Sequence, residues 1–408
     1  MSKDKIISFI IPNVNTKNYL KWCYNSIRKN LGYRHEIVLL DDGSTDDSWE
    51  WIQEIHEKDP NTKIHKNEEN VGIAYSYNTA VDLASNEIVC LLHSDMYIPP
   101  KFDEVMLKNL EKYEFVTAWR VEPAIYPESK DKVQVEFGRK LSEFDEQAFL
   151  KWSDKNTIDN KDKDWTRACF PWMTTKKLFK DIGGVDCLFL KYMVDDDDLY
   201  LRVAMTGAKM KQTFETAVYH MCSRSTKYKD DEINDDGSDE WNKQHKKSTR
   251  NFIRKWGVHQ SSVYTETDDG IEMVPPKKYD IGFVVKNATD ESLDFLEPWC
   301  SNIYIEDPYL MQEYFKYEQG NTLYDLTDRV KLTGRGLTNG VLVEFDILKM
   351  TNEGMNFLTN LPAVLSTSGQ IGDMKWKEFN LHIRSLETIE HENIVCENKI
   401  IYLDKEKN

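Results

Sequence analysis

Short apolar runs alternate with helix-patterned segments through the first hundred residues, and this alternation limits the possible folds more than any other feature. Residues 6–11, IISFII, form a continuous apolar run that stops at Pro12. A run that is apolar at every position is typical of a strand buried on both faces, as in a parallel sheet. Further strands are predicted at 36–40, 62–67 and 87–92. Strands that alternate with helices at this spacing predict a doubly wound α/β domain.

The length of 408 residues allows two or three domains. We predict a first domain at 1–257, a linker at 258–278 and a second, smaller α/β domain of unknown function at 279–408. Four candidate strands lie in the second domain, at 281–285, 302–305, 341–345 and 400–403. The polar stretch 225–248 predicts a mobile loop or flap, with a plain solvated loop as the alternative.

Composition excludes several classes of protein. A net charge of −17 disfavours nonspecific binding to nucleic acid, so no nucleic-acid partner is expected. The seven cysteines are scattered without a CxxC pair, which favours free thiols in a reducing compartment. Every apolar run is shorter than the roughly 18 residues of a transmembrane segment. The expected location is therefore cytoplasmic.

Acidic and imidazole side chains stand where predicted strands end or helices begin. These residues are Asp41, Asp42, His93, Ser94, Asp95, the run Asp195–Asp198, and His220. In open α/β sheets, ligands bind beyond the carboxyl ends of the strands. Mg²⁺ and Mn²⁺ prefer carboxylate oxygens, and Mn²⁺ also accepts imidazole. A cation held here would offset the negative charge of the protein and admit a diphosphate.

Each feature also has a simpler interpretation when it is taken alone. Asp41 and Asp42 fit a turn followed by a helix cap, and Asp95 fits another turn. His220 fits a satisfied core histidine. The run Asp195–Asp198 fits a helix N-terminus enriched in acids, which the helix dipole favours.

Five segments, in their order along the chain, resemble family 2 glycosyltransferases. They are ISFIIPNVNTKNYLKWCYNSI, EIVLLDDGSTDDS, NVGIAYSYNTAVDLASNEIVCLLHSDMYIPP, ACFPWMTTKKLFKDIGGVDCLFLKYMVDDDDLYLR and RNFIRKWG. The resemblance covers residues 6–257. It implies a GT-A domain that transfers a sugar, with inversion, from a nucleotide-diphosphate donor to a glycan or related acceptor hydroxyl. A UDP-sugar donor and Mn²⁺ or Mg²⁺ are expected. The chain has no QxxRW motif after the aspartate run, so we expect a non-processive enzyme.

The resemblance assigns the donor site residue by residue. Positions in the nucleotide-binding segments are Pro12, Asn13, Asn15, Asp41, Asp42, Gly72 and Asn78. Asp41 or Asp42 would hydrogen-bond the base of the nucleotide. His93, Ser94 and Asp95 occupy the DxD motif, where Asp95 is the metal ligand and His93 replaces the first acid. His93 would hydrogen-bond a ribose hydroxyl. His220 stands where some members of the family place a further metal ligand.

The same resemblance assigns the chemistry. Asp196 matches the catalytic base, and Asp195 beside it would raise the proton affinity of that base. Arg224 and Lys227 are candidates to clamp the diphosphate. Trp165, Arg167 and Trp172 are candidates to contact the acceptor, with core packing as the open alternative.

Two other classes of function compete with this interpretation. A catalytically inactive protein that binds a glycan or nucleotide during assembly is the main alternative, because the first acid of the DxD motif is missing. A nucleotidyltransferase on a similar sheet is the other, but the chain lacks the Gly-rich phosphate loop that this chemistry uses.

Overall fold

The computed structural model describes residues 5–389 except 128, 130–131, 162, 164–169, 190, 229–238, 269 and 335. The described residues form two compact units. Unit 1 contains the chain up to Gln244 together with Tyr264–Met273, and unit 2 contains His245–Val263 and the chain from Val274 onward. The domain boundaries inferred from the sequence stay a prediction.

Unit 1 is built on a nine-stranded mixed sheet in the order β3-β2-β1-β4-β8-β6-β9-β5, with β7 paired to β6. β1 pairs in parallel with β2 and β4, and β8 is antiparallel to both β4 and β6. The strands are β1 (Ile7–Asn13), β2 (Glu36–Asp42), β3 (Thr62–Asn67), β4 (Ile88–Leu91), β5 (Met96–Tyr97), β6 (Phe115–Glu122), β7 (Lys132–Gln134), β8 (Trp172–Thr175) and β9 (Met210–His220).

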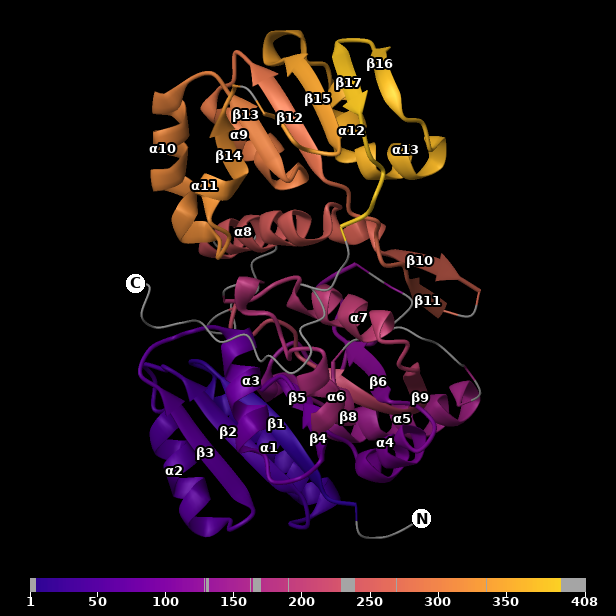
Figure 1. Cartoon of the computed structure of the whole chain (residues 1–408). Coiled ribbons are helices and arrows are strands. Elements are labelled where there is room, and N and C mark those ends of the chain that lie inside the picture. Colours follow the sequence, from indigo (N-terminus) through magenta and orange to yellow (C-terminus); the bar gives the residue numbers. More distant parts are fainter. Residues whose placement is uncertain are drawn as a thin grey trace. The chain divides into compact units, whose positions relative to one another are not determined.

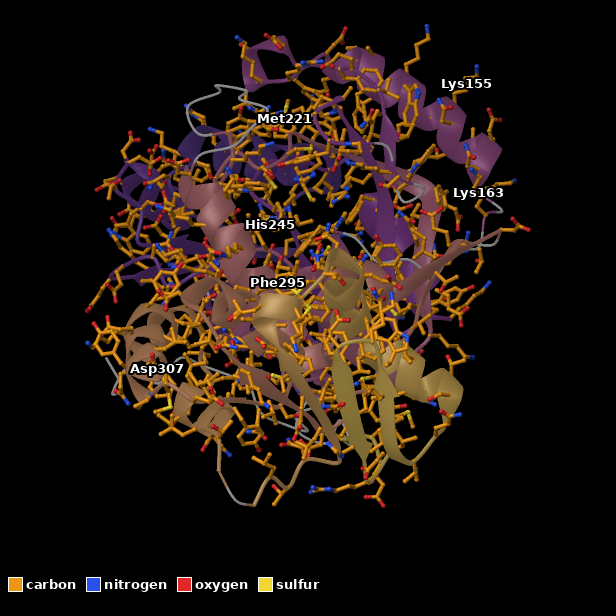
Figure 2. All side chains as sticks on the ribbon, turned by 90° about the horizontal axis from the view of Figure 1, so that it is seen from above. Lys155, Lys163, Met221, His245, Phe295 and Asp307 are labelled. Carbon is orange, nitrogen blue, oxygen red and sulfur yellow. The ribbon has the colours of Figure 1, made fainter. Side chains whose placement is uncertain are left out.

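Seven helices of unit 1 connect these strands (Figure 1). They are α1 (Lys17–Leu31), α2 (Ser48–Lys58), α3 (Ile73–Leu83), α4 (Phe102–Leu110), α5 (Glu146–Asn160), α6 (Lys176–Asp181) and α7 (Asp195–Met205). All seven residues of β1 are buried, as its apolar run predicts. Lys155 lies on α5 and Lys163 follows the end of that helix (Figure 2).

The prediction of a loop at 225–248 is wrong for its second half, because α8 (Asp239–Trp256) begins within it. The buried side of this helix starts with polar residues, among them Gln244 and Ser248, so no apolar period marks the helix in the sequence. The side chain of Gln244 donates to the carbonyl of Phe189 at 3.2 Å, which satisfies its amide. Residues 229–238 of the predicted loop lie outside the described residues.

A short hairpin lies in the stretch that the sequence predicts to be a linker. Its strands are β10 (Tyr264–Thr267) and β11 (Gly270–Met273), and they pair in antiparallel fashion.

Unit 2 has its own six-stranded sheet in the order β14-β13-β12-β15-β17-β16. Its strands are β12 (Ile281–Lys286), β13 (Asn302–Ile305), β14 (Val330–Leu332), β15 (Val341–Asp346), β16 (Gly372–Trp376) and β17 (Phe379–Ile383). Three of the four predicted strands are confirmed as β12, β13 and β15, and the fourth lies outside the described residues. β14, β16 and β17 were not predicted.

Five further helices belong to unit 2: α9 (Asp290–Leu296), α10 (Pro308–Glu318), α11 (Leu326–Arg329), α12 (Asn352–Thr359) and α13 (Leu361–Ser368). Figure 2 marks Phe295 on α9 and Asp307, whose carboxylate caps α10 by accepting from the backbone of Tyr309 at 2.8 Å. The two sheets share a pattern. The parallel order β14-β13-β12-β15 repeats β3-β2-β1-β4, and an antiparallel strand follows in each sheet.

The five cysteines within the described residues are free and buried, as predicted for them: Cys23, Cys90, Cys187, Cys222 and Cys300. Among the described residues, no helix combines the length and the apolar character that a membrane span requires.

Candidate active site

The polar residues singled out in the first domain gather at one edge of the unit 1 sheet. β1 lies between β2 and β4, and all three run in parallel. Their carboxyl ends therefore meet at the same edge, which is where open α/β sheets bind ligands. Asn13 and Asp42 end β1 and β2, and residues 93–95 follow β4.

The loop after β1 is joined to the end of β4. Pro12 is buried within β1, opposite Leu40. The side-chain oxygen of Asn13 accepts from the Thr16 hydroxyl at 2.6 Å, and that hydroxyl lies 3.1 Å from the Ser94 hydroxyl. The geometry of one strand end therefore constrains the other.

Asn15 joins the same loop to the loop after β2. Its backbone is left-handed, with φ of 53°, a conformation that Asn adopts more readily than most residues. Its side-chain oxygen accepts from the backbone N–H of Thr45 at 2.7 Å and of Asp46 at 3.2 Å. Asn15 thus fixes the position of the acidic turn.

Asp41 and Asp42 differ in how their oxygens are used. Asp42 accepts from the backbone N–H groups of Val71 and Gly72, each at 3.0 Å, and so joins β2 to the start of α3. Asp41 accepts from the backbone N–H of Ser44 at 3.2 Å through one oxygen. Its other oxygen is buried without a hydrogen-bond partner among the described residues. Burial raises the pKa of Asp41, and a donor on a ligand would satisfy the remaining oxygen.

Gly72 and Asn78 lie at the start and in the middle of the α3 region. Gly72 precedes the helix with φ of 99°, which favours glycine. Asn78 is fully buried, and its amide both donates to and accepts from the backbone of Val185, at 2.8 and 2.9 Å. Gly184 has φ of +69°, and a Cβ there would lie 2.3 Å from the Asn78 oxygen. Asn78 therefore holds the turn at Gly183 and Gly184 in place.

Three potential metal ligands come together beyond β4. His93, Asp95 and His220 each offer one ligand atom, and the three atoms lie within 4.8 Å of one another. His220 Nε2 lies 3.3 Å from an Asp95 oxygen and 3.4 Å from His93 Nδ1. The antiparallel pairing of β5 with β9, which sets Met96 opposite His220, produces this proximity. In Figure 2, Met221 marks the position next to His220 at the end of β9.

Glu122 supports this group from the end of β6. One of its oxygens lies 2.8 Å from His220 Nδ1. An ionised carboxylate can only accept, so Nδ1 carries a proton and Nε2 faces Asp95 and His93. Arg120 and Lys132 form ion pairs with Glu122, each at 2.8 Å, and neutralise its charge.

The charges of the group are strongly coupled. Burial raises the pKa of Asp95, but His220 outweighs this effect and holds the pKa below the usual range. Burial lowers the pKa of His220, but neighbouring Cys222 and Asp95 outweigh it and raise the pKa well above its usual value. Burial, and then the charge of His220, lower the pKa of His93 to about 3. The site thus favours a neutral His93 beside an ionised Asp95.

The aspartate run opens α7, and its members have different surroundings. Asp195 is 8% exposed, whereas Asp196 and Asp197 are half-buried. Burial, and then the charge of Asp196, raise the pKa of Asp195 to about 7. Asp198 is buried and pairs with Arg202 at 2.8 Å.

Tyr77 connects the aspartate run to the candidate metal ligands. This phenol is fully buried and donates to the carbonyl of Leu92 at 2.8 Å. Its pKa is raised well above the usual value by burial, then by the charges of Asp195 and Asp95. The two aspartates therefore lie close enough to act on the same side chain.

Arg224 and Lys227 follow β9, and their cationic groups have partners within the protein. The Arg224 guanidinium donates to the carbonyls of Met221, at 3.1 Å, and of Arg139. Its backbone N–H, by contrast, donates to Asp95 at 3.2 Å. The Lys227 ammonium lies 5.2 Å from the ring centroid of Trp241 and is surrounded by aromatic rings.

Of the three acceptor candidates, Trp165 and Arg167 lie outside the described residues. Trp172 has no exposed surface, and its indole N–H donates to the Tyr200 hydroxyl at 2.6 Å. This placement favours the core-packing alternative for Trp172.

Glu122, Thr16 and Ser44 contribute to the site but were not found from the sequence. Glu122 is 98 residues from its partner His220, and no motif relates the two. Thr16 and Ser44 lie beside predicted residues, in loops whose hydrogen bonds depend on the packed fold.

Residues 8–183 match the family model described as Glycosyl transferase family 2. The chain is 33% identical over 114 residues to glycosyltransferase GlyA of Streptococcus pneumoniae. The aligned stretch covers 28% of the chain and 16% of GlyA. It is 33% identical over 107 residues to the chondroitin synthase of Pasteurella multocida, covering 26% of the chain and 11% of the synthase. The chain therefore spans only a small part of these relatives' length.

The solved structures that match this chain include S. aureus TarS 1–349 in complex with UDP-GlcNAc. That match has a TM-score of 0.40 and 16% identity, and it covers 63% of this chain and 74% of TarS 1–349. GalNAc-T7 with UDP, GalNAc and Mn²⁺ has a TM-score of 0.41 and 12% identity, covering 53% and 43% of the two chains. At these TM-scores the similarity supports no inference about function. The family match and the sheet order together confirm the predicted α/β fold class, a GT-A domain with a second, smaller sheet domain.

Proposed function

Because residues 8–183 match the family 2 glycosyltransferase model, we propose that this chain transfers one sugar from a nucleotide-diphosphate donor to an acceptor hydroxyl. The acceptor is a glycan or a related molecule, and each catalytic cycle adds a single residue. The observation that most supports this proposal is the group His93, Asp95 and His220 beside the acidic start of α7. A cation for the leaving group and a base for the nucleophile are the two components that the reaction requires.

The nucleotide would bind over the loops that follow β1 and β2. Asp41 is the better candidate to hydrogen-bond the base, since one of its buried oxygens lacks a partner among the described residues. Both oxygens of Asp42 already accept hydrogen bonds, from the backbone of Val71 and Gly72 and from the Asn67 amide. A uracil base can donate a hydrogen bond from its ring N–H to Asp41. We therefore propose that the sugar donor is a UDP-sugar.

The cation would be held by Asp95 and His220. Asp95 offers a carboxylate, and the Nε2 of His220 lies 3.3 Å from one of its oxygens. Mn²⁺ accepts a carboxylate and an imidazole as ligands. When bound, the cation would stabilise the negative charge of the departing diphosphate. The backbone N–H of Arg224 donates a hydrogen bond to Asp95 and so fixes the position of the carboxylate.

Asp196 would act as the base. It would accept the proton of the attacking hydroxyl while the new C–O bond forms at the anomeric carbon and the bond to the diphosphate breaks. A displacement of this kind, from the face opposite the leaving group, inverts the anomeric centre. Asp195, with a pKa of about 7, would be about half protonated at neutral pH, which reduces the negative charge beside Asp196.

The test is a panel of nucleotide sugars, in which release of the nucleoside diphosphate is measured with Mn²⁺ and with a chelator. Slow donor hydrolysis or transfer that requires the cation is the expected result. Donor binding by calorimetry without turnover for any acceptor would instead favour a catalytically inactive binding protein.

A further inference from the structure

The group at the end of β4 contains one potential ligand more than the predicted pair. His93 stands where a first acid was expected, and its Nδ1 lies 3.4 Å from His220 Nε2. Asp95 lies on the same side, 3.3 Å from that Nε2. Two imidazole nitrogens and a carboxylate oxygen therefore converge within 4.8 Å.

We propose that His93 is a direct metal ligand, so that two imidazoles and one carboxylate hold the cation, which is a transition-metal ion rather than Mg²⁺. This inference rests on the proposed function, because the cation is the one that would serve the donor diphosphate. It replaces the ribose contact that the motif position suggested for His93.

The orientation of His93 favours this role. Its ring packs against Phe170, with ring centroids 4.0 Å apart, which restricts its rotation. The carbonyl of His93 accepts from the thiol of Cys23 at 3.8 Å, so the backbone is also held. A ring fixed in this way presents Nδ1 to His220 and Asp95 without the entropic cost of ordering a mobile side chain.

The orientation of His220 is fixed from its other side. Glu122 accepts from Nδ1–H, so Nε2 points at Asp95 and His93 and can offer a lone pair to a metal once the metal displaces its proton. Such a carboxylate behind the imidazole is the usual outer partner of a metal-bound histidine. The arrangement therefore includes both the ligands and the support that a metal site needs.

A second possible group of ligands shares His220 but is a poorer site. It consists of Glu122, His220 and Cys222. Glu122 is already neutralised by Arg120 and Lys132, and burial raises the pKa of the Cys222 thiol. Since His220 Nδ1 carries its proton toward Glu122, this side of the ring has no lone pair to offer.

The donor set predicts which cation binds. Mg²⁺ prefers oxygen ligands and keeps most of its water, whereas imidazole suits first-row transition metals. Affinity at such a site generally increases from Mn²⁺ to Co²⁺. We expect the protein, without any donor, to bind Co²⁺ and Mn²⁺ at least about tenfold more tightly than Mg²⁺.

The test is the binding of Mn²⁺ and Co²⁺ to tag-free full-length protein without nucleotide, in wild type, His93→Gln and the control His65→Gln. His65 is a partly buried strand histidine of the same unit. Pulsed EPR of the Mn²⁺ complex should show two coordinated imidazole nitrogens in wild type and in the control, and one in His93→Gln. The dissociation constant of His93→Gln should rise by about tenfold or more. Equal affinities, or one nitrogen in wild type, would overturn the proposal.

A second variant, His93→Asp, keeps a ligand but changes its chemistry. The preference for Co²⁺ over Mg²⁺ should shrink in this variant, because a carboxylate replaces an imidazole. An unchanged preference would contradict a role of His93 as a ligand. The outcomes for the two proposals are separable. Cation-dependent donor turnover with one coordinated nitrogen would leave the function standing and remove this inference, and the reverse result would remove only the function.

Discussion

Asp195 and Asp196 are adjacent in the chain, yet the fold gives their carboxyl groups different environments. Asp195 is 8% exposed, whereas Asp196 is half-buried and accepts from the backbone N–H of Asp197 at 2.9 Å. Two carboxylates so close cannot both ionise without cost, and the buried one is the member that keeps its proton. This difference separates the roles that we propose for the two residues.

Replacing Asp195 should change how the stability of the protein depends on pH. Its pKa is about 7 in the folded chain and 3.8 as the ordinary value. Between these values the folded state binds a proton that the unfolded state has released, so the free energy of unfolding falls as pH rises through this window. Asp195→Asn removes this loss. We expect its melting temperature to exceed that of wild type at about pH 8, with the difference shrinking toward about pH 4, in thermal melts across pH. A difference that does not vary with pH would contradict the environment described for Asp195.

The start of α7 is held by a buried ion pair within the same helix. Val194 and Met193 enter the helix with positive φ, at 56° and 82°, which is strained for these residues. Arg202, one turn after Asp198, donates to the carbonyls of Ile182 and Gly184 as well as to Asp198. The pair therefore joins the helix that presents the acids to the Gly-Gly turn.

Asp198→Ala should lower the free energy of unfolding by about 3–5 kcal/mol, because it leaves the Arg202 guanidinium buried without its counter-charge. Urea denaturation measures this loss. The control is Asp181→Ala, which breaks a solvent-exposed pair with Lys177 and should cost less than about 1 kcal/mol. Similar losses in the two variants would show that the buried pair does not hold α7.

The strands and helices differ in how clearly the sequence marks them. β1 and β4 were predicted because each is a local apolar run. β14, with three residues, is too short to show a period, and α8 buries polar side chains at its start. Asp95 and His220 were each proposed as metal ligands from the family resemblance. Their contact, however, depends on β5 pairing with β9, and Glu122 enters only through that packing.

At the scale of the whole molecule, each unit has its own sheet and its own hydrophobic core. In unit 2 the core includes a buried charge, Glu297, which accepts from Arg254 at 2.6 Å and from Arg329. Burial raises the pKa of Glu297, but Arg329 and Arg254 outweigh it and hold the pKa at about 2. Unit 2 thus contains a polar network at which its stability can be tested separately.

Glu297→Gln should destabilise unit 2 by about 3 kcal/mol or more, since two guanidinium groups lose their shared counter-charge. Hydrogen exchange resolved by peptide should become faster in β12, β13 and β15 and stay unchanged in β1, β2 and β4. The matched control is Glu313→Gln, on the solvent-exposed pair with Lys316. Faster exchange throughout both units would contradict separate cores.

The most direct test of the proposed mechanism compares Asp196→Asn with Asp197→Asn, its half-buried neighbour. Donor binding is measured by thermal shift with Mn²⁺, as a titration with the nucleotide sugar that the wild type uses. Turnover is measured as release of the nucleoside diphosphate. Both variants should bind the donor like wild type, and Asp196→Asn alone should lose turnover, by about a hundredfold or more. Turnover that survives in Asp196→Asn would contradict the assignment of the base and the mechanism built on it.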